Sequence, residues 1–320
     1  MIEKRAMKFA LVVCTINRST LVESLLIAVG KQSSKPDCVV VVDSSPDDQT
    51  KSVVENFRAP FDLHYVHSQK GLPHQRNVGI KTIEEVYALK NLDYVGFLDD
   101  DVSISPDYFQ CASEALAENP KAILVGGYDK LLSIRATNRI EQILQLNSKK
   151  MGQVLRSGLV TYVKPEKKFE EVTWVPGHSF NVRASAFESV KFRGHVRMYG
   201  EDVEIQIRLG KLGQIIAVKD MGVVHYKSDV SRESLRNNVA YDDGFRFWLS
   251  GQHPEIVKKR WVIVSTVLLA TRSFLLSFSN DGITHRLVFK GHLDFFRRLI
   301  ARKQIEQFVE HDEWVTFEEW

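Results

Sequence analysis

Cysteine is scarce in this sequence, and neither sign of charge is in strong excess. The three cysteines, Cys14, Cys38 and Cys111, are odd in number and lack the spacing typical of a metal site. Cys14 and Cys38 fall in apolar, strand-like runs, which predicts reduced core residues and fits a reducing cytoplasm. The net charge of +3 over 320 residues gives no whole-chain indication of nucleic-acid binding.

Long apolar runs and a secretory signal are lacking as well. The apolar run near the start ends at Cys14, and no small-residue cleavage site follows it. The most apolar stretch, from Trp261 to Phe278, is interrupted by Arg272 and falls short of the ~20 apolar residues that a spanning helix needs. These features predict a cytoplasmic protein without transmembrane helices.

Strand-like and helix-like segments alternate along the first hundred residues. Apolar and β-branched runs predict strands at 9–14, 38–43, 63–68 and 93–99. Apolar residues at helical spacing predict helices within 19–32, 44–57 and 73–89. Residues 38–43 are nearly all β-branched, so we expect this strand to be buried on both faces. The alternation predicts an α/β fold with a mostly parallel sheet flanked by helices.

The pattern is looser after residue 110. It predicts a helix at 106–118, a strand at 122–127, an irregular excursion over 128–172, a helix at 200–213, and final strands at 213–218 and 222–228. From about residue 231 the composition becomes helical, aromatic and basic. We therefore predict a catalytic domain over residues 1–230 and a helical extension over residues 231–320.

Polar side chains mark the ends of the predicted strands. Thr15 and Asn17 follow the first strand, Asp43 ends the second, and residues 99–101 end the fourth. Ligands of such sheets bind beyond the carboxyl ends of the strands, so these groups are expected to converge on one crevice. Asp and Asn also favour turns for their own sake, and for Asp43 both interpretations stay open.

Three consecutive aspartates, Asp99, Asp100 and Asp101, follow the fourth strand. Adjacent carboxylates repel one another unless a cation lies near, and oxygen ligands suit Mg²⁺ or Mn²⁺. Asp99 and Asp101 are two residues apart in an extended segment and point the same way, so they can share one ligand while Asp100 faces another. The alternative is a solvated acidic turn before the helix that starts near Pro106.

Two further polar positions are candidates for chemistry. Glu201 and Asp202 begin a predicted helix, whose dipole stabilises carboxylates there, although an acidic first turn is common in any protein. His225 follows an apolar strand as a candidate metal ligand, with a purely structural histidine as the alternative.

A tight Pro-Gly turn carries Trp174, Gly177 and His178. An aromatic wall beside polar groups suits a sugar ring, so these residues are candidates for a sugar or acceptor pocket. The alternative is that Trp174 is a core residue.

The order of the motifs is more specific than any one of them. The sequence runs through T-x-N-R, VVD, G-x(3)-Q-R-N-x-G, LDDD, P-G-x(3)-N-x-R, GED-x-E and a late strand with histidine. This series, from about Lys8 to Ser228, resembles the family 2 glycosyltransferases. The resemblance implies the GT-A fold, a Rossmann-like α/β architecture.

The same resemblance implies roles by position. The nucleotide sugar is expected to meet Thr15, Asn17, Arg18, Asp43, Arg76, Asn77, Asp99 and Asp100. Of these, Thr15, Asn17 and Asp43 are expected at the base and ribose. Arg76 and Asn77 are expected near the diphosphate, and Asp99 near the ribose or the sugar.

The resemblance also implies the chemistry. Asp101 is expected to bind Mn²⁺ or Mg²⁺ with help from His225, and Asp202, beside Glu201, to be the catalytic base. A base that deprotonates the acceptor hydroxyl permits a single displacement, which inverts the anomeric configuration. The donor is expected to be a UDP-sugar, with GDP- and dTDP-sugars as alternatives. The acceptor is expected to be a glycan or lipid-linked saccharide in cell-surface polysaccharide synthesis.

Two other functions compete with sugar transfer. Sugar-nucleotide nucleotidyltransferases carry a glycine-rich loop after the first strand, and "CTINRST" lacks those glycines. A non-catalytic sugar-binding module would not need Asp101 and Asp202. Processive members of the resembled family carry Q-x-x-R-W; here "QHPEIVKK" precedes Arg260–Trp261, which favours transfer of one or a few sugars.

The segment 252–303 combines aromatic residues with ten basic and three acidic residues. That composition predicts an amphipathic surface helix on anionic lipid, at the inner face of a membrane. The alternative is a helical cap that packs on the catalytic domain or on a second subunit. The sequence does not predict an oligomeric state.

Overall fold

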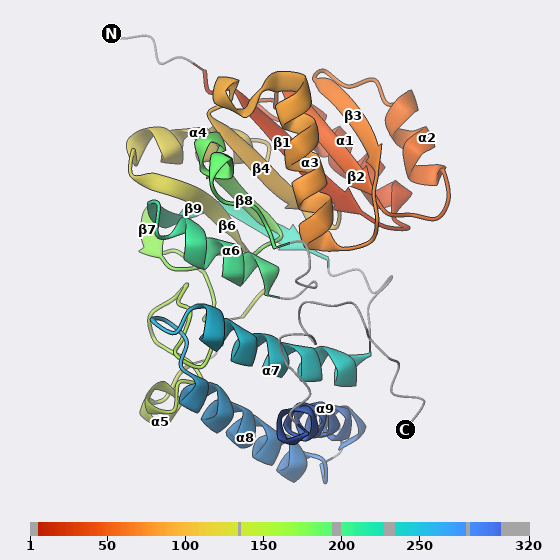
Figure 1. Ribbon diagram of the computed structural model, residues 1–320. Helices are drawn as coiled ribbons and strands as arrows, with labels where there is room; N and C mark the ends of the chain where they lie inside the picture. The colour runs from red at the N-terminus through yellow and green to blue at the C-terminus, as the bar shows by residue number, and fades with distance from the viewer. Residues whose placement is uncertain (1–5, 134–135, 194–199, 227–233, 280–281, 302–320) are drawn as a thin grey trace. The chain divides into compact units, whose positions relative to one another are not determined.

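The computed structural model describes residues 6–133, 136–193, 200–226, 234–279 and 282–301 (Figure 1). The chain divides into two compact units. The first comprises Met1–Ile134, Tyr162–Gly194 and Glu201–Ser231, and the second comprises Arg135–Thr161, His195–Gly200 and Arg232–Trp320. The domain boundary predicted between residues 230 and 231 stays a prediction, and the second unit also takes in residues 135–161.

One mixed sheet organises the first unit. Its strand order is β3 (Asp62–His67), β2 (Cys38–Asp43), β1 (Phe9–Thr15), β4 (Tyr94–Asp99), β8 (Ser179–Arg183), β6 (Ala122–Asp129), β9 (Gln214–His225) and β5 (Val102–Ser103), with β7 (Phe169–Val172) also paired to β9. The pairs β3–β2, β2–β1, β1–β4 and β6–β9 are parallel. The predicted α/β fold with a mostly parallel sheet is confirmed.

Helices cover both faces of this sheet. They are α1 (Ser19–Gly30), α2 (Gln49–Asn56), α3 (Leu72–Tyr87), α4 (Tyr108–Glu118) and α6 (Glu201–Leu209), with short 3₁₀ turns η1 (Leu89–Asn91) and η2 (Ala184–Glu188). Leu11 and Val13 of β1 pack in one cluster with α1 and α4, whereas Val12 lies against Gly79 of α3. Successive strand residues point to opposite faces, so α3 covers one face and α1 and α4 the other. Strand β2 is accordingly buried along its whole length.

The two final strands predicted at 213–218 and 222–228 are wrong, because one continuous strand, β9, runs from Gln214 to His225. Exposed Lys219 and Asp220 are the polar break that suggested two strands. Between Gly126 and Tyr128 the pairing of β6 with β9 shifts register, and such a bulge lets a strand continue past extra residues. Residues 227 and 228 lie outside the described residues.

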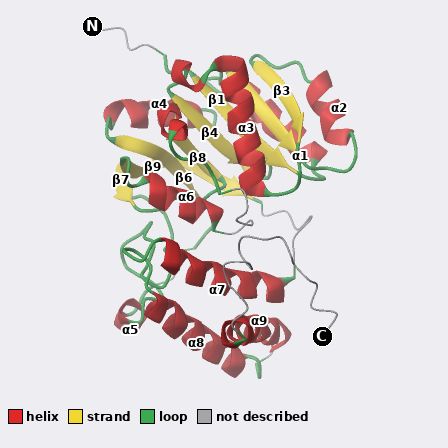
Figure 2. Ribbon diagram, in the orientation of Figure 1, coloured by secondary structure: helices red, strands yellow, loops and turns green. Residues whose placement is uncertain are grey.

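The second unit contains helices and an irregular segment over residues 144–161 (Figure 2). Its helices are α5 (Arg139–Ile143), α7 (Leu235–Gln252), α8 (Lys259–Leu276) and α9 (Gly282–Ile300), and α9 packs against both α7 and α8. The predicted helical C-terminal extension is thus confirmed. None of the helices among the described residues is both long and apolar enough to cross a membrane.

Gly127 tests the register shift between β6 and β9. A Cβ atom at this position would lie 2.0 Å from the carbonyl oxygen of Met221, so the backbone must move to accept one. We expect Gly127→Ala to lower the free energy of unfolding by about 1–3 kcal/mol, as overpacking does. The matched control is Gly30→Ala, where the nearest atom is 3.6 Å away. Urea denaturation measures both, and equal stability of the two variants would contradict the expectation.

Candidate active site

The register of the sheet brings the polar strand ends together. Thr15 at the end of β1 pairs with Asp43 at the end of β2, and Cys14 pairs with Asp99 at the end of β4. Parallel neighbours end at the same edge, and this is the edge where such sheets bind ligands. Strand β8 is antiparallel to β4, with Ser179 opposite Leu98, so the turn that precedes β8 reaches the same edge.

Basic and hydroxyl groups surround the second and third aspartates. The Thr15 hydroxyl donates to Asp100 Oδ2 at 2.6 Å, and Arg18 Nη1 donates to Asp100 Oδ1 at 2.9 Å. The same Arg18 nitrogen lies 3.7 Å from Asp101 Oδ2. Burial raises the pKa of Asp100, against the opposing effects of Thr15 and Arg18. The three aspartates are therefore not an open acidic turn, because Asp100 and Asp101 are both buried.

Asp99, Asp101 and His225 form a candidate metal centre. One ligand atom from each can lie within 4.8 Å of the others. His225 Nε2 is 3.1 Å from Asp101 Oδ1, and it reaches this position because β9 pairs His225 with Val102. Burial lowers the pKa of His225, but the hydrogen bond and charge of Asp101 outweigh it, so the pKa is raised overall. Two carboxylates and an imidazole fit a divalent ion such as Mn²⁺.

Arg76 of α3 joins this cluster to the start of α6. Its side chain is almost fully buried. Nη1 donates to Glu201 Oε1 at 3.1 Å, and Nη2 donates to the Gly177 carbonyl at 2.9 Å and lies 3.5 Å from Asp99 Oδ1. One guanidinium thus fixes two carboxylates and the Pro-Gly turn relative to one another. Burial raises the pKa of Asp99 to about 6, although the Arg76 charge opposes the rise.

The Asn77 side chain holds the backbone of Phe192, whose ring lies beside Arg76. Its Nδ2 donates to the Phe192 carbonyl at 2.7 Å, and its Oδ1 accepts from the Phe192 amide at 3.0 Å. The Phe192 ring centroid lies 5.3 Å from the Arg76 guanidinium, which is within cation–π range. The described contacts of the Asn77 amide are therefore structural, and its role near a diphosphate stays a prediction.

Asp202 is held by three N–H donors. Oδ2 accepts from the Gly177 amide at 3.0 Å and from Trp174 Nε1 at 3.4 Å, and Oδ1 accepts from the Val203 amide at 2.9 Å. A Cβ atom on Gly177 would lie 2.7 Å from Asp202 Oδ2, so only glycine allows this approach. Burial raises the pKa of Asp202, and the Arg76 charge opposes it. The carboxylate is fixed in direction and more basic than an exposed aspartate.

Glu201 precedes this aspartate on α6 and is also buried. Burial and the neighbouring Asp202 charge raise its pKa to about 7, against the opposing charge of Arg76. Its Oε1 accepts from Arg76, whereas its buried Oε2 has no hydrogen-bond partner within the described part of the chain. Glu201 is therefore largely protonated below a pH of about 7. Its Oε1 also orients the Arg76 guanidinium.

His178 sits between the turn and the metal candidates. Its carbonyl accepts from the Asp99 amide at 3.0 Å, and its ring centroid lies 4.8 Å from that of His225. Its Nδ1 is 2.9 Å from the Ser179 hydroxyl. The structure thus brings Trp174, Gly177 and His178 to the same edge as the aspartates.

Ser45 has no role in the sequence-based prediction, yet it links two predicted residues. Asp43 Oδ1 accepts from the Ser45 amide at 2.9 Å and from its hydroxyl, and the hydroxyl accepts from the Asn17 amide at 2.7 Å. Asn17 has a φ of 56°, in the left-handed region. Asp43 Oδ2 accepts from Tyr65 at 3.1 Å. The loop after β1 is therefore tied to the end of β2 through Ser45.

Gln75 is the second residue that the sequence reasoning missed. Its Nε2 donates to the carbonyls of Thr15 and Val42, both at 3.0 Å. The amide thereby binds the last carbonyl of β1 and the second-last carbonyl of β2, and it anchors the start of α3. The only signal for it is its place in the Q-R-N motif.

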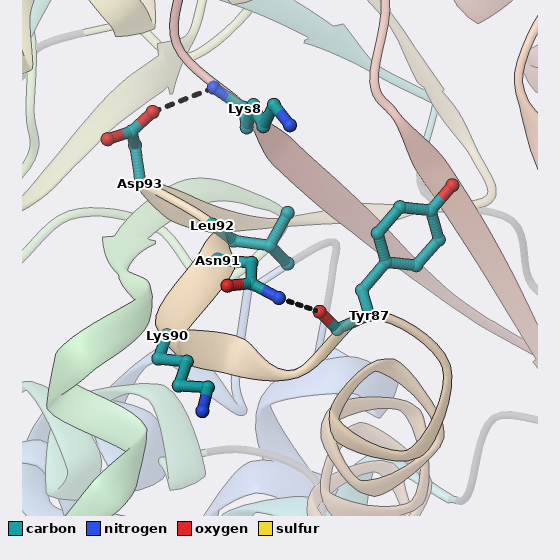
Figure 3. Close-up of a pocket in the computed structure, with 6 residues that line it drawn as sticks. All are labelled: Lys8, Tyr87, Lys90, Asn91, Leu92 and Asp93. Atoms are coloured by element: carbon teal, nitrogen blue, oxygen red, sulfur yellow. Dashed lines mark hydrogen bonds between the residues drawn. The ribbon is translucent and has the colours of Figure 1, made fainter.

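A cavity of about 370 Å³ lies elsewhere (Figure 3). It is lined by Lys8, Tyr87, Lys90, Asn91, Leu92 and Asp93. Lys8 and Asp93 directly precede β1 and β4, so the cavity lies at the opposite end of these strands from Thr15 and Asp99. It lacks the clustered acids of the site, and we assign it no role in the chemistry.

Direct metal binding tests the candidate centre. We expect Asp101→Asn to weaken Mn²⁺ binding more than about tenfold, because even the partners of metal ligands have effects of that size. The loss of the free-ion signal in electron paramagnetic resonance reports bound Mn²⁺. Asp107→Asn, on an exposed aspartate in the same segment, is the matched control. Unchanged affinity in Asp101→Asn would remove this residue from the ligand set.

The raised pKa of Glu201 predicts that the stability of the protein depends on pH. Its folded-state pKa of about 7 exceeds the ordinary value of 4.5, so the folded protein keeps a proton that the unfolded chain loses. The free energy of unfolding should therefore fall as pH rises from 4.5 to 7, by up to about 3 kcal/mol from this group. Glu201→Gln should flatten that fall, and Glu23→Gln on the exposed side of α1 should not. Identical pH profiles in urea denaturation would refute the prediction.

Comparisons with known proteins bear on the family. No curated protein matches the sequence. S. aureus TarS 1–349 in complex with UDP-GlcNAc is similar over 95% of this chain and 82% of that chain, at 17% identity and a TM-score of 0.56. Mannosyltransferase PcManGT from Pyrobaculum calidifontis, in complex with GDP-Man and Mn²⁺, is similar over 92% and 88%, at 15% identity and a TM-score of 0.55. The chain spans 44% of a longer S. aureus TarS chain.

These structural likenesses concern the fold, and the predicted GT-A architecture is confirmed. Residues 10–175, just over half of the 320 residues, match the family model described as glycosyl transferase family 2. The matched region contains the ends of β1, β2 and β4 and the three aspartates. The chain belongs to glycosyl transferase family 2.

Proposed function

We propose that this chain transfers a sugar from a nucleoside-diphosphate sugar to a hydroxyl group of a saccharide acceptor, with inversion at the anomeric carbon. The observation that carries the proposal is the arrangement around Arg76. This one guanidinium links a cluster fit for a divalent ion, through Asp99, to the carboxylates that begin α6, through Glu201. An enzyme of this kind needs both parts, one for the diphosphate and one for the acceptor hydroxyl.

The donor is proposed to be a UDP-sugar, with a GDP- or dTDP-sugar as the alternative. TarS 1–349 is described in complex with UDP and with UDP-GlcNAc, and PcManGT with GDP-Man and Mn²⁺. Both are similar to this chain in fold. A hexosyl group is accordingly the group that we propose to be transferred.

The donor half of the site lies at the ends of β1, β2 and β4. We assign the base and ribose to Asn17, Asp43 and Thr15, whose loop is ordered by Ser45. Asp43 is fully buried, so it acts by fixing this loop as well as through any contact of its own. Arg18 is half-buried and already holds Asp100.

Asp99, Asp101 and His225 are proposed to hold Mn²⁺ or Mg²⁺. When bound, such an ion offsets the negative charge that grows on the departing diphosphate. The protein contributes the position of the ligands, because Arg76 fixes Asp99 and the pairing of β5 with β9 fixes His225 beside Asp101.

Asp202 is the proposed general base. It takes the proton of the acceptor hydroxyl as that oxygen bonds to the anomeric carbon and the bond to the diphosphate oxygen breaks. The proton ends on Asp202, and the nucleoside diphosphate leaves from the opposite face. The amides of Gly177 and Val203 and the Trp174 indole hold the carboxylate in one direction during this step.

The acceptor is proposed to be a glycan or a lipid-linked saccharide in cell-surface polysaccharide synthesis. Trp174 offers an aromatic face next to the proposed base, as sugar-binding sites do, and Gly177 and His178 lie on the same turn. We place the reaction at the inner face of a membrane, where a lipid-linked acceptor is presented.

The proposed base has a direct test. We expect Asp202→Asn to slow sugar transfer by about 10²–10⁴-fold, the usual effect of losing a general base. UDP binding, measured by calorimetry in the presence of Mn²⁺, should persist because the donor contacts lie at other residues. Asp220→Asn, on an exposed aspartate of β9, is the matched control for transfer. Transfer by Asp202→Asn at the wild-type rate would move the role to another group, with Glu201 first.

A further inference from the structure

Helix α8 exposes several apolar side chains, while three of its five buried residues carry hydroxyl groups. Its buried residues are Val262, Ser265, Thr266, Ala270 and Ser273. Its exposed apolar residues, with one from the turn after it, are Val264, Val267, Phe274, Leu275 and Phe278. The exposed fractions reach 64% for Leu275 and 74% for Phe278. A helix that packs on an ordinary protein core turns its apolar face inward, so this one is arranged for a different surrounding.

Two of the buried hydroxyl residues of α8, Ser265 and Thr266, serve a buried ion pair. Arg246 of α7 pairs with Asp243 and is 1% exposed. Its Nη1 donates to Ser265 Oγ at 3.0 Å, and Thr266 Oγ1 donates to Asp243 Oδ1 at 3.1 Å. His292 Nδ1 of α9 is 2.6 Å from Asp243 Oδ2. A buried ion pair needs such partners, so the two hydroxyl residues cannot turn outward.

The outer surface of α8 continues onto α9. The Phe274 ring lies 5.3 Å from that of Phe278 and 5.2 Å from that of Phe289. On α9, Ile283 is 77% exposed and Ile300 is 80% exposed. We call the exposed apolar residues of α8, its following turn and α9 the apolar face.

The charges around the apolar face have one sign. Helix α8 carries exposed Lys259, Arg260 and Arg272 and no acidic residue, and exposed Arg286 and Lys290 lie on α9. Among the described residues, Arg272, Arg286 and Lys290 form no ion pair. The one acid of α9, Asp294, is buried and paired with Arg236 and Arg297. No exposed carboxylate of α8 or α9 therefore offsets this positive charge. We call these exposed basic residues, Lys259, Arg260, Arg272, Arg286 and Lys290, the basic rim.

We propose that the apolar face and its basic rim dock on the surface of an anionic lipid bilayer, with α8 lying in the plane of the interface. Apolar side chains enter the acyl boundary and the basic groups meet acidic headgroups, which is how interfacial helices bind. A second copy of this chain on the same face would set like charges against each other. The inference names the surface for the proposed membrane location and rests on that part of the proposed function.

Vesicle binding by the full chain is the test. We expect the protein to sediment with vesicles of phosphatidylglycerol and phosphatidylcholine at low salt, and to be released at high salt because screening weakens the ionic part. It should bind vesicles of phosphatidylcholine alone much more weakly. The double variant Leu275→Ser, Phe278→Ser should bind at least about tenfold more weakly, since these apolar groups lose their transfer energy. Leu212→Ser, at a half-exposed leucine of the first unit, is the matched control.

Charge reversal probes the basic rim separately. Arg272→Glu, Arg286→Glu and Lys290→Glu together should weaken binding by about 100-fold or more, because each basic residue near anionic lipid contributes about a factor of five. Lys31→Glu, at an exposed lysine beyond α1, should leave binding unchanged. An unchanged melting temperature in each variant shows that the fold persists.

Three results would overturn the proposal. They are no binding to anionic vesicles at low salt, equal binding by the apolar double variant, and a dimer in light scattering that this variant abolishes. A further outcome concerns the acidic tail, which lies outside the described residues. If only the triple variant Glu310→Gln, Asp312→Asn, Glu313→Gln bound anionic vesicles, the tail and not a bilayer would be the occupant of the apolar face, and the proposal would fail. Sugar transfer to a water-soluble acceptor is measured in parallel, so failure of catalysis and failure of docking are told apart.

Discussion

The buried guanidinium of Arg76 is the interaction on which the site depends. It ties Asp99, Glu201 and the Gly177 carbonyl to one another, and these groups come from a strand end, a helix start and a turn that are far apart in the chain. Without this cation, the buried Glu201 carboxylate would lose its charged partner, which is strongly destabilising. The same contact orients the turn whose amide holds Asp202. Arg76 therefore both holds the parts of the site together and fixes the position of Asp202.

The three aspartates illustrate how a fold makes an acidic run tolerable. Arg76 lies at Asp99, Arg18 and the Thr15 hydroxyl lie at Asp100, and His225 lies at Asp101. Each carboxylate has a different neighbour because β4 ends at Asp99 and a turn follows over residues 100–101, rather than the extended segment that the sequence predicted. The cluster is thus held in place by its neighbours, with Asp99 and Asp101 near one another as two ligands of a divalent ion would be.

Much of the fold follows from sequence, because β-branched runs such as residues 38–43 and polar strand ends such as Asp43 are local signals. The family could be predicted for the same reason, since its motifs lie at strand ends. Contacts between distant segments could not be predicted. No local pattern tells that Gln75 caps two strands, that Ser45 joins Asn17 to Asp43, or that β9 passes Asp220 without a break. The orientation of α8 is hidden too, because Ser265 and Thr266 look like surface residues until the burial of Arg246 is known.

Because β8 runs antiparallel to β4, the proposed donor and acceptor parts of the site come from different segments of the chain. The first hundred residues supply the strand ends proposed for the donor, whereas Trp174 to Asp202 supply the turn and base proposed for the acceptor. The match to the family model ends at residue 175, where this second segment begins. On the proposed assignment, acceptor preference can diverge through substitutions within residues 174–202, which include β8 and η2, while the strand ends proposed for the donor stay unchanged. On the same assignment, exchanging residues 174–202 between relatives would change the acceptor and leave the donor as it is.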